Sequence, residues 1–465
     1  MSRIDHSQLQ GNILRGYRFG LVRHMLLEVT DRATVRAFLG VAAQGGGAEV
    51  PAITVDQPPD KTWPRDQKPA SCFNIGLTFA GLRALGVAPG DLATFPTEFR
   101  EGMAARATKL GDFGESAPRA WSQPFNRPEQ IHLVASIHAD STAELDKVDT
   151  QVSRAFAVRG RLDGYALAQD KVYFGYTDSI SQPKFSHVKD EVEPIDPYGT
   201  VLLGEPTRQE GLKFGVPTPQ VLGHHGTFNA FRVLRQHVTA FEQYLDRAAT
   251  ELLNHPDSAL VLPLDAQFSD GEKPLDRHGM LREVVAAQMC GRWRNGVPYG
   301  SSPDTMPDPA SVPLTEYDYG RGSRCPVGSH MRRTNPRGGA IVQRIANYTR
   351  RLVRRGMSYG PIHTEGDSEP EVGLLGNFIG ASLGAQFEAV MCDWLNLGLQ
   401  DPDITGANDP LIGANSSETS WFDVTLRNGG TIRLRGFPRF VSTRGGVYTF
   451  LPSMPAIRYL ARLKG

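Results

Sequence analysis

Short apolar runs along the first half of the chain are each followed closely by a segment with the periodicity of an amphipathic helix. The apolar runs suit strands, because β-branched and aromatic residues recur in them and polar turn residues bound them. The pairs are HMLLEVT (24–30) before ATVRAFLGVAA, CFNIGLT (72–78) before FAGLRALGV, and QIHLVASIHA (130–139) before TAELDKVDTQVSRAF. This half is therefore predicted to combine strands with helices that cover them.

The second half repeats this organisation. Its pairs are FNAFRVL (228–234) before HVTAFEQYL, LLGNFIGAS (374–382) before LGAQFEAVMCDWLNL, and VYTFLPS (447–453) before PAIRYLARL. Between the halves, residues 188–226 are rich in Pro, Gly and acidic residues, which is typical of a linker or a long surface connection. Because strands and helices mix without a steady parallel βαβ rhythm, we predict two α+β domains that divide near residue 215.

Composition excludes several classes of protein. The 465 residues are enough for two domains, and 50 basic residues balance 50 acidic ones, so no net charge favours nucleic acid or an anionic membrane. No apolar leader and no apolar stretch of membrane-spanning length is present, and we predict a cytoplasmic location. The cysteines form no CxxC pair, which argues against a zinc site or a disulfide framework: Cys72, Cys290, Cys325 and Cys392.

A histidine and three arginines share the stretch CPVGSHMRRTNPR (325–337). The ordinary interpretation of a lone histidine in such a loop is a cap or a hydrogen-bonding group. The arginines add a second interpretation, because haem needs an imidazole nitrogen for its iron and cations for its two propionates. His330 is thus a candidate iron ligand.

Arg354 and Arg355 lie in the stretch RRLVRRGMSYGP (350–361). In one interpretation they end a helix, because basic side chains favour the negative end of a helix dipole and Gly356 suits a C-cap. In the other, one arginine of the pair faces a pocket while its neighbour points away. The residues alone leave both interpretations open.

Asp178 lies in FGYTDSISQP (174–183), a segment with the composition of a tight turn. Aspartates in turns commonly accept hydrogen bonds from the backbone two residues on, which is the ordinary interpretation. A carboxylate held beside an arginine can instead relay a proton, while the guanidinium stabilises developing charge. Asp178 is therefore also a candidate acid–base group.

Taken together, these segments resemble the dye-decolorizing peroxidases, a family of haem enzymes. GYTDSISQP is similar to the family signature GFxDGISQP. Further matching segments follow in the family's order along nearly the whole chain: QGNILRGY, GRWRNGVP (291–298), CPVGSHMRRTNPR, LVRRGMSYGP, GLLGNFIGASLGAQFE (373–388), DPLIG (409–413) and PRFVSTRGGVYTFLPS (438–453). One such segment is weak evidence, whereas this many in order make chance a poor explanation.

The resemblance implies an α+β fold of two ferredoxin-like domains, with antiparallel sheets covered by helices. The N-terminal domain (1–215) would carry the distal aspartate, and the C-terminal domain (216–465) would bind one haem b. The implied roles are His330 as proximal ligand of the haem iron, Asp178 as distal acid, Arg354 as distal arginine, Gln182, Arg332 and Leu374 as haem contacts, with Arg332 beside a propionate, and Asp409 as the carboxylate that orients His330.

The implied activity is a peroxidase that reduces hydrogen peroxide and oxidises bulky aromatic, dye-like or phenolic one-electron donors through a ferryl intermediate. Asp178 would move the peroxide proton, and Arg354 would stabilise the charge that separates along the O–O bond. The alternative is a haem-binding or haem-handling protein with weak peroxidase turnover. Asp178 and Arg354 favour the peroxidase, because haem storage needs neither.

Two positions depart from the family pattern. Ser179 stands where the signature has glycine, so a positive φ at this position would strain the turn that aims Asp178. Gly376 stands where the family's GLLF segment has phenylalanine, which predicts a wider distal side of the pocket.

Overall fold

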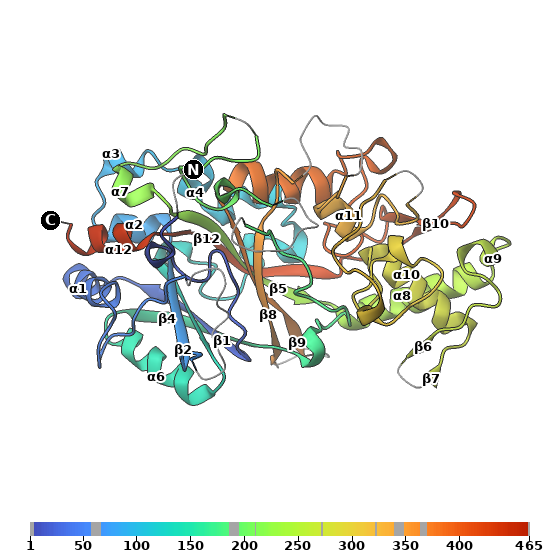
Figure 1. The fold of residues 1–465 in the computed structure, drawn as a ribbon, viewed down its shortest axis with the longest axis horizontal. Coiled ribbons are helices and arrows are strands. Elements are labelled where there is room, and N and C mark those ends of the chain that lie inside the picture. The colour runs from blue at the N-terminus through green and yellow to red at the C-terminus, as the bar shows by residue number, and fades with distance from the viewer. Residues whose placement is uncertain are drawn as a thin grey trace.

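A barrel of eight strands in the order β1-β3-β2-β12-β5-β9-β8-β4 forms the centre of the molecule (Figure 1). The computed structural model describes residues 4–56, 67–185, 195–209, 211–270, 273–320, 323–338, 348–362 and 370–463. The barrel strands are β1 (Leu21–Glu28), β2 (Ser71–Leu77), β3 (Leu133–Ala139), β4 (Ala157–Tyr165), β5 (Thr227–Gln236), β8 (Val353–Ile362), β9 (Glu371–Gly380) and β12 (Val441–Leu451).

The barrel consists of two antiparallel sheets, β4-β1-β3-β2 from the first half of the chain and β12-β5-β9-β8 from the second. Counted along each half, both sheets have the order fourth, first, third, second strand, which is the order of a ferredoxin-like sheet. The two sheets meet at two short seams, where Phe450 pairs with Leu77 and Tyr165 pairs with Ser358. The predicted pair of ferredoxin-like units is confirmed, and the structure adds that they close into one barrel.

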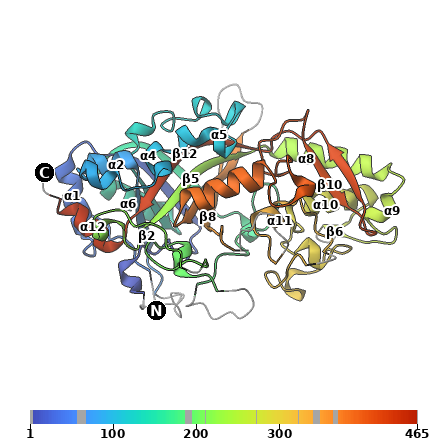
Figure 2. The same cartoon turned by 90° about the horizontal axis from the view of Figure 1, so that it is seen from above.

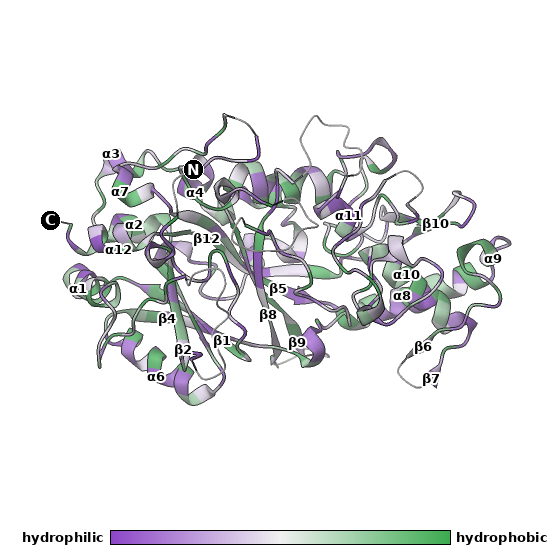
Figure 3. Ribbon diagram, in the orientation of Figure 1, coloured by the Kyte–Doolittle hydropathy of each residue, from purple (hydrophilic) through white to green (hydrophobic). Residues whose placement is uncertain are grey.

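In the first unit, α1 (Arg32–Ala42) and α6 (Thr142–Ser153) cover the outer face of the sheet. The carboxylate of Asp31 accepts hydrogen bonds from the first backbone N–H groups of α1, and Ser141 caps α6 in the same way. Figure 3 shows hydrophilic and hydrophobic residues on both helices, as expected of amphipathic helices that lie between a sheet and solvent. The sequence pattern had predicted both.

In the second unit, α8 (Val238–Leu253) and α10 (Arg277–Cys290) pack on each other and form a lobe beside the barrel (Figure 2). This lobe also carries α9 (Ser258–Val261), β6 (Ser269–Asp270), β7 (Lys273–Pro274), β10 (Trp421–Thr425) and β11 (Thr431–Arg435). The segment predicted as a helix after β9 is π-helical, in two parts, η10 (Leu383–Glu388) and η11 (Val390–Asn396). The short helices are α2 (Phe79–Ala84), α3 (Pro89–Leu92), α4 (Thr97–Glu101), α5 (Ala107–Leu110), α7 (Gln220–Gly223), α11 (His330–Thr334) and α12 (Met454–Ala461).

The C-terminal helix α12 lies against α1, so the end of the chain packs on its beginning (Figure 1). Residue 215, the predicted boundary between domains, falls in the long connection between β4 and β5, of which residues 186–194 and 210 lie outside the described residues. Within the described ranges, no helix is long and apolar enough to cross a membrane.

The interior of the barrel holds polar side chains as well as apolar ones. His24 Nδ1 lies 2.8 Å from the Ser136 hydroxyl, and the side-chain amide of Asn229 donates to that of Asn377 at 2.8 Å. Burial lowers the pKa of His24 to about 3, and burial together with the charge of Arg355 lowers the pKa of His138 to about 4. Both histidines are therefore neutral at physiological pH.

Candidate active site

A cavity of about 340 Å³ lies on the face of the second sheet that points away from the barrel interior. The sheet forms part of its wall through pairs of residues that face each other on neighbouring strands. Arg354 of β8 pairs with Phe378 of β9, and Gly356 pairs with Gly376. The π-helical segment and α11 supply further walls, as do residues 110–112 and 172–182 from the first half of the chain. The volume is within the range of about 300–1,000 Å³ that is usual for small-molecule sites.

Most of the predicted site residues line this one cavity: Asp178, Gln182, His330, Arg354 and Leu374. They come from segments that are far apart in the sequence, and the barrel brings them together. Asp409 adjoins the cavity through its contact with His330. Arg332 is not part of the cavity wall.

His330 is the first residue of α11, and its Nδ1 lies 3.1 Å from Oδ2 of Asp409. Asp409 is fully buried, and its Oδ1 accepts the backbone N–H groups of Leu411 and Ile412 at 2.9 Å each. Burial alone would raise the pKa of Asp409, but His330 and Arg333 outweigh burial and hold this pKa below its usual value. An ionised Asp409 thus fixes the imidazole through Nδ1 and leaves Nε2 as the ring nitrogen available to a ligand.

The two arginines that follow His330 are used in different ways. Arg333 is buried and donates to the carbonyls of Gly328, Trp394 and Ala407 at 2.9–3.0 Å, which ties the His330 segment to the π-helix. Arg332 donates to the Cys325 carbonyl at 2.6 Å and lies over the ring of Tyr319. Neighbouring residues on a helix point in different directions, and neither arginine lines the cavity. The place of Arg332 beside a haem propionate stays a prediction.

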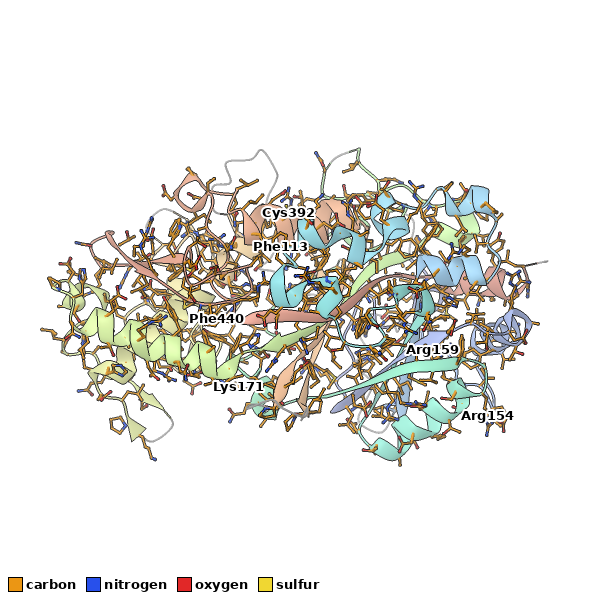
Figure 4. All side chains as sticks on the ribbon, turned by 180° about the vertical axis from the view of Figure 1, so that it is seen from behind. Phe113, Arg154, Arg159, Lys171, Cys392 and Phe440 are labelled. Carbon is orange, nitrogen blue, oxygen red and sulfur yellow. The ribbon has the colours of Figure 1, made fainter. Side chains whose placement is uncertain are left out.

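Other arginines line the cavity instead. They are Arg232, Arg292, Arg350, Arg351 and Arg439, besides Arg354 and Arg355. Arg439 comes from the segment before β12, and its guanidinium donates to the carbonyl of Gly111 at 2.9 Å. Figure 4 shows Phe113 and Phe440, which follow these two residues, near the middle of the molecule. Sequence reasoning missed these cations, although two of them lie in matching motifs: Arg292 in the GRWRNGVP segment and Arg439 in the PRFVSTRGGVYTFLPS segment.

Arg354 and Arg355 belong to strand β8 and not to the end of a helix. Pairing with β9 fixes this conformation, and successive side chains on a strand point to opposite faces. The side chain of Arg354 consequently faces the cavity. Arg355 adjoins the cavity too, but its side chain lies against Gly16 and the half-buried Tyr17. Burial, together with the charge of Arg354, lowers the pKa of Arg355 to about 10. The second of the two sequence interpretations is the correct one.

Gln182 holds the main chain of Arg354. Its side-chain amide donates to the Arg354 carbonyl at 2.9 Å and accepts from the Arg354 N–H at 3.0 Å. The guanidinium of Arg354 in turn donates to the Ser181 carbonyl. The haem contact of Gln182 stays a prediction. What its hydrogen bonds do is position Arg354.

Arg354 and Asp178 interact electrostatically. Burial lowers the pKa of Arg354, and the negative charge of Asp178 raises it in part. More than a third of the Arg354 surface is open, and because protein surrounds the guanidinium, this open surface is cavity wall and not bulk surface. The side chain of Asp178 is open on the same cavity. An acid and a cation therefore share one water-accessible enclosure.

The turn that carries Asp178 has a strained backbone. The Asp178 N–H donates to the Asp170 carbonyl at 2.8 Å, and the next residue, Ser179, has φ of 61°. This is the left-handed region that favours glycine. The condition foreseen for Ser179 is thus met, and its serine adopts the conformation for which the family signature has glycine. Arg337 and Arg351 steady the following residues, at the Ser181 hydroxyl and the Gln182 carbonyl, each at 3.1 Å.

Gly376 lines the cavity, but the ring of Phe378 occupies part of the space beside it. A Cβ at Gly376 would lie 2.8 Å from that ring, closer than a real Cβ contact allows. Gly356, its cross-strand partner, also lacks a side chain. The ring of Phe378 therefore takes part of the space that a larger residue at position 376 would need, and a wider distal pocket stays a prediction.

Comparison with known proteins gives a consistent picture. The family model described as the DyP dimeric alpha+beta barrel domain matches residues 8–161. The dye-decolorizing peroxidase of Mycena epipterygia is 27% identical over 98% of this chain and 87% of that protein, and the multifunctional dye peroxidase of an Amycolatopsis species is 26% identical over 97% and 95%. A solved dye-decolorizing peroxidase in complex with 2,6-dimethoxyphenol is 26% identical, with a TM-score of 0.77 over 99% of this chain and 100% of that one.

Proposed function

The chain belongs to the dye-decolorizing peroxidases, and from this premise we propose that it binds one haem b and uses hydrogen peroxide to oxidise bulky aromatic one-electron donors. The observation that carries the proposal is the shared cavity, which combines an aspartate-bound histidine, His330, with an acid, Asp178, and an arginine, Arg354. These are the groups that a haem peroxidase needs on the two sides of its iron.

The residues of the cavity fit a haem. His330 offers Nε2 to the iron, because Asp409 takes Nδ1. Apolar side chains such as Leu374, Leu395 and Leu411 suit the faces of a porphyrin. Four cavity arginines can supply the positive charges that pair with the haem propionates: Arg292, Arg350, Arg351 and Arg439. When bound, haem supplies an iron centre that takes up the oxidising equivalents of hydrogen peroxide and releases them one electron at a time.

Asp178 moves the proton in the proposed reaction. It would accept a proton from one oxygen of hydrogen peroxide and return it to the other, which then leaves as water, while the haem described above supplies the two electrons. The carboxylate of Asp178 is open on the cavity and interacts electrostatically with Arg354, which suits this role. Ser179 and the hydrogen bond to Asp170 fix the turn from which it acts.

Arg354 stabilises the negative charge that develops as the O–O bond breaks. It acts from a fixed place, because Gln182 holds its main chain and Ser181 accepts from its guanidinium. A donor that is already oriented needs little reorganisation during the reaction, and removal of such a donor typically costs about 100- to 1,000-fold in turnover.

Phenols are the reductant class that we propose first. A relative of known structure binds 2,6-dimethoxyphenol, and this chain is 26% identical to it over nearly its whole length. The cavity can admit peroxide more easily than a bulky donor, so larger dyes would deliver electrons from outside it.

Haem titration of the purified chain, followed by peroxide-dependent oxidation of 2,6-dimethoxyphenol, tests the proposal. We expect stoichiometric haem binding that His330→Ala abolishes and that Asp409→Asn weakens by about 10- to 100-fold, because the carboxylate orients the ligand. Arg154→Leu serves as the control with full activity, because Arg154 is exposed and is not among the residues that line the cavity; Figure 4 shows it at the edge of the molecule. Haem binding without peroxide-dependent turnover would favour the alternative, a haem-handling protein.

A further inference from the structure

A group of metal-ligating side chains lies outside the cavity. It consists of Glu205, His224 and His225, whose donor atoms all lie within 4.8 Å of one another. In the described part of the chain, this is the only such group of three His, Cys, Asp or Glu residues. His225 Nε2 lies 2.8 Å from Oε1 of Glu205, and all three side chains are partly open to solvent.

The backbone brings the two imidazoles to the same side. Neighbouring residues of an extended chain point in opposite directions, but His225 has φ of 58°, in the left-handed region. The two rings stack as a result, with centroids 3.9 Å apart. Backbone strain of this kind in a non-glycine residue persists only where surrounding structure imposes it.

Hydrogen bonds and a glycine impose this geometry. The N–H of Leu203 donates to the Gly226 carbonyl at 3.0 Å, and the N–H of His225 donates to the Leu203 carbonyl at 3.1 Å. Gly204 lies between these contacts, and a Cβ there would come within 2.8 Å of the His224 ring. The absence of a side chain at Gly204 therefore gives His224 its place beside Glu205.

We propose that Glu205, His224 and His225 bind a divalent transition-metal ion of the zinc class. Two imidazoles and one carboxylate are a donor set of Zn²⁺ sites that keep a fourth position open to solvent, whereas Mg²⁺ and Ca²⁺ prefer oxygen donors throughout. Zinc–ligand bonds of about 2.0–2.2 Å draw the three donors together and open the ring stack. The positive charge of Lys213 near His224 disfavours a bound cation, and the negative charge of Glu205 counteracts it.

The bound ion would connect two parts of the chain. Glu205 belongs to the connection between β4 and β5, and His224 and His225 come directly before Thr227, where β5 begins. The ion would thus fasten this connection to the first strand of the second sheet. It would raise the thermal stability of the protein without haem, because a ligand of the folded state stabilises that state.

Zn²⁺ titration of the tag-free full chain, after removal of metals, tests this proposal, with the His330→Ala variant as background so that the cavity histidine does not contribute. We expect one Zn²⁺ per chain, an increase in melting temperature with added Zn²⁺, and at least tenfold weaker binding in Glu205→Gln and in His225→Ala. Co²⁺ should give the intense visible bands of a tetrahedral site.

The matched control is His255→Ala, at a partly exposed histidine whose Nδ1 lies 3.9 Å from Asp257. It should bind Zn²⁺ like the parent chain. Equal Zn²⁺ affinity in the parent, Glu205→Gln and His225→Ala would overturn the proposal, as would the absence of stoichiometric binding. Neither result depends on haem or peroxide, so the zinc experiments do not test the peroxidase proposal.

Discussion

Ser179 carries the backbone strain of the distal turn, directly beside the proposed proton acceptor. A left-handed conformation costs a residue with a Cβ roughly 1–2 kcal/mol, and Ser179 adopts it with φ of 61°. Asp178, one residue earlier, owes its direction to this turn. A glycine at the same position would hold the same conformation without strain.

Ser179→Gly is therefore expected to stabilise the protein by about 1 kcal/mol, measured as the free energy of unfolding in denaturant. Peroxidase turnover should stay close to that of the parent, because the turn keeps its shape. Ser302→Gly is the control, since φ of Ser302 is −146° and glycine relieves no strain there. A loss of stability in Ser179→Gly would show that the serine side chain, and not its backbone, matters.

The residues of the site differ in how far the sequence could identify them. His330, Asp178 and Arg354 lie in segments with strong family signatures, and the cavity brings them together. Arg332 could not be told from Arg333 by sequence, because both follow the histidine in the same run and only the packing of α11 separates them. The hydrogen bonds of Gln182 to Arg354 depend on the pairing of segments 172 residues apart.

At the scale of elements, β8 shows how tertiary pairing decides a local conformation. Arginines before a glycine also suit the end of a helix, and nothing within RRLVRRGMSYGP excludes it. Pairing of Val353–Tyr359 with β9 makes the segment a strand, and the strand in turn separates Arg354 from Arg355. Most other strands and helices of the two units could be predicted, because their apolar periodicity reflects a single buried face.

A side chain added at Gly376, which pairs with Gly356, is expected to lower the free energy of unfolding. In Gly376→Ala the new methyl meets the ring of Phe378, so we expect a loss of about 1–3 kcal/mol in the free energy of unfolding. Gly376→Ala combined with Phe378→Leu should recover most of this loss, because the smaller side chain leaves room. Equal destabilisation in the single and double variants would contradict a clash between these two positions.

At the scale of the whole molecule, two ferredoxin-like sheets close into one barrel with polar residues inside. The repeat of strands and helices predicted the two sheets, but their closure rests on two seams between strands far apart in the sequence, which no local pattern reveals. The division near residue 215 and a cytoplasmic location stay predictions. Closure buries His24 and half-buries His138, and both histidines are uncharged at neutral pH.

These two interior histidines predict sensitivity to acid. Their pKa values in the folded protein, about 3 and about 4, lie below the usual 6.5, so below pH 6.5 the unfolded chain binds protons that the folded chain does not. Stability is therefore complete above pH 6.5 and falls as the pH drops toward 4, by up to about 1.4 kcal/mol per pH unit for each histidine. Denaturant unfolding at pH 7 and pH 5 measures this loss.

His24→Gln should lose less stability between these two pH values than the parent chain does, because one of the two interior histidines with a lowered pKa is gone. His255→Gln, at a partly exposed histidine, should leave the loss unchanged. The same pH dependence in the parent and in His24→Gln would assign the acid sensitivity to other groups.

The proposed function rests on the activation of peroxide by Asp178 and Arg354 at a haem held by His330. Stopped-flow mixing of the ferric haem-loaded protein with one equivalent of hydrogen peroxide, with the Soret band as the signal, tests it most directly. We expect a rapid spectral change in the parent and in Arg154→Leu, and a change at least about 100-fold slower in Asp178→Ala and Arg354→Leu. A ferric Soret band that peroxide leaves unchanged in the parent, or equal rates in all four proteins, would contradict it.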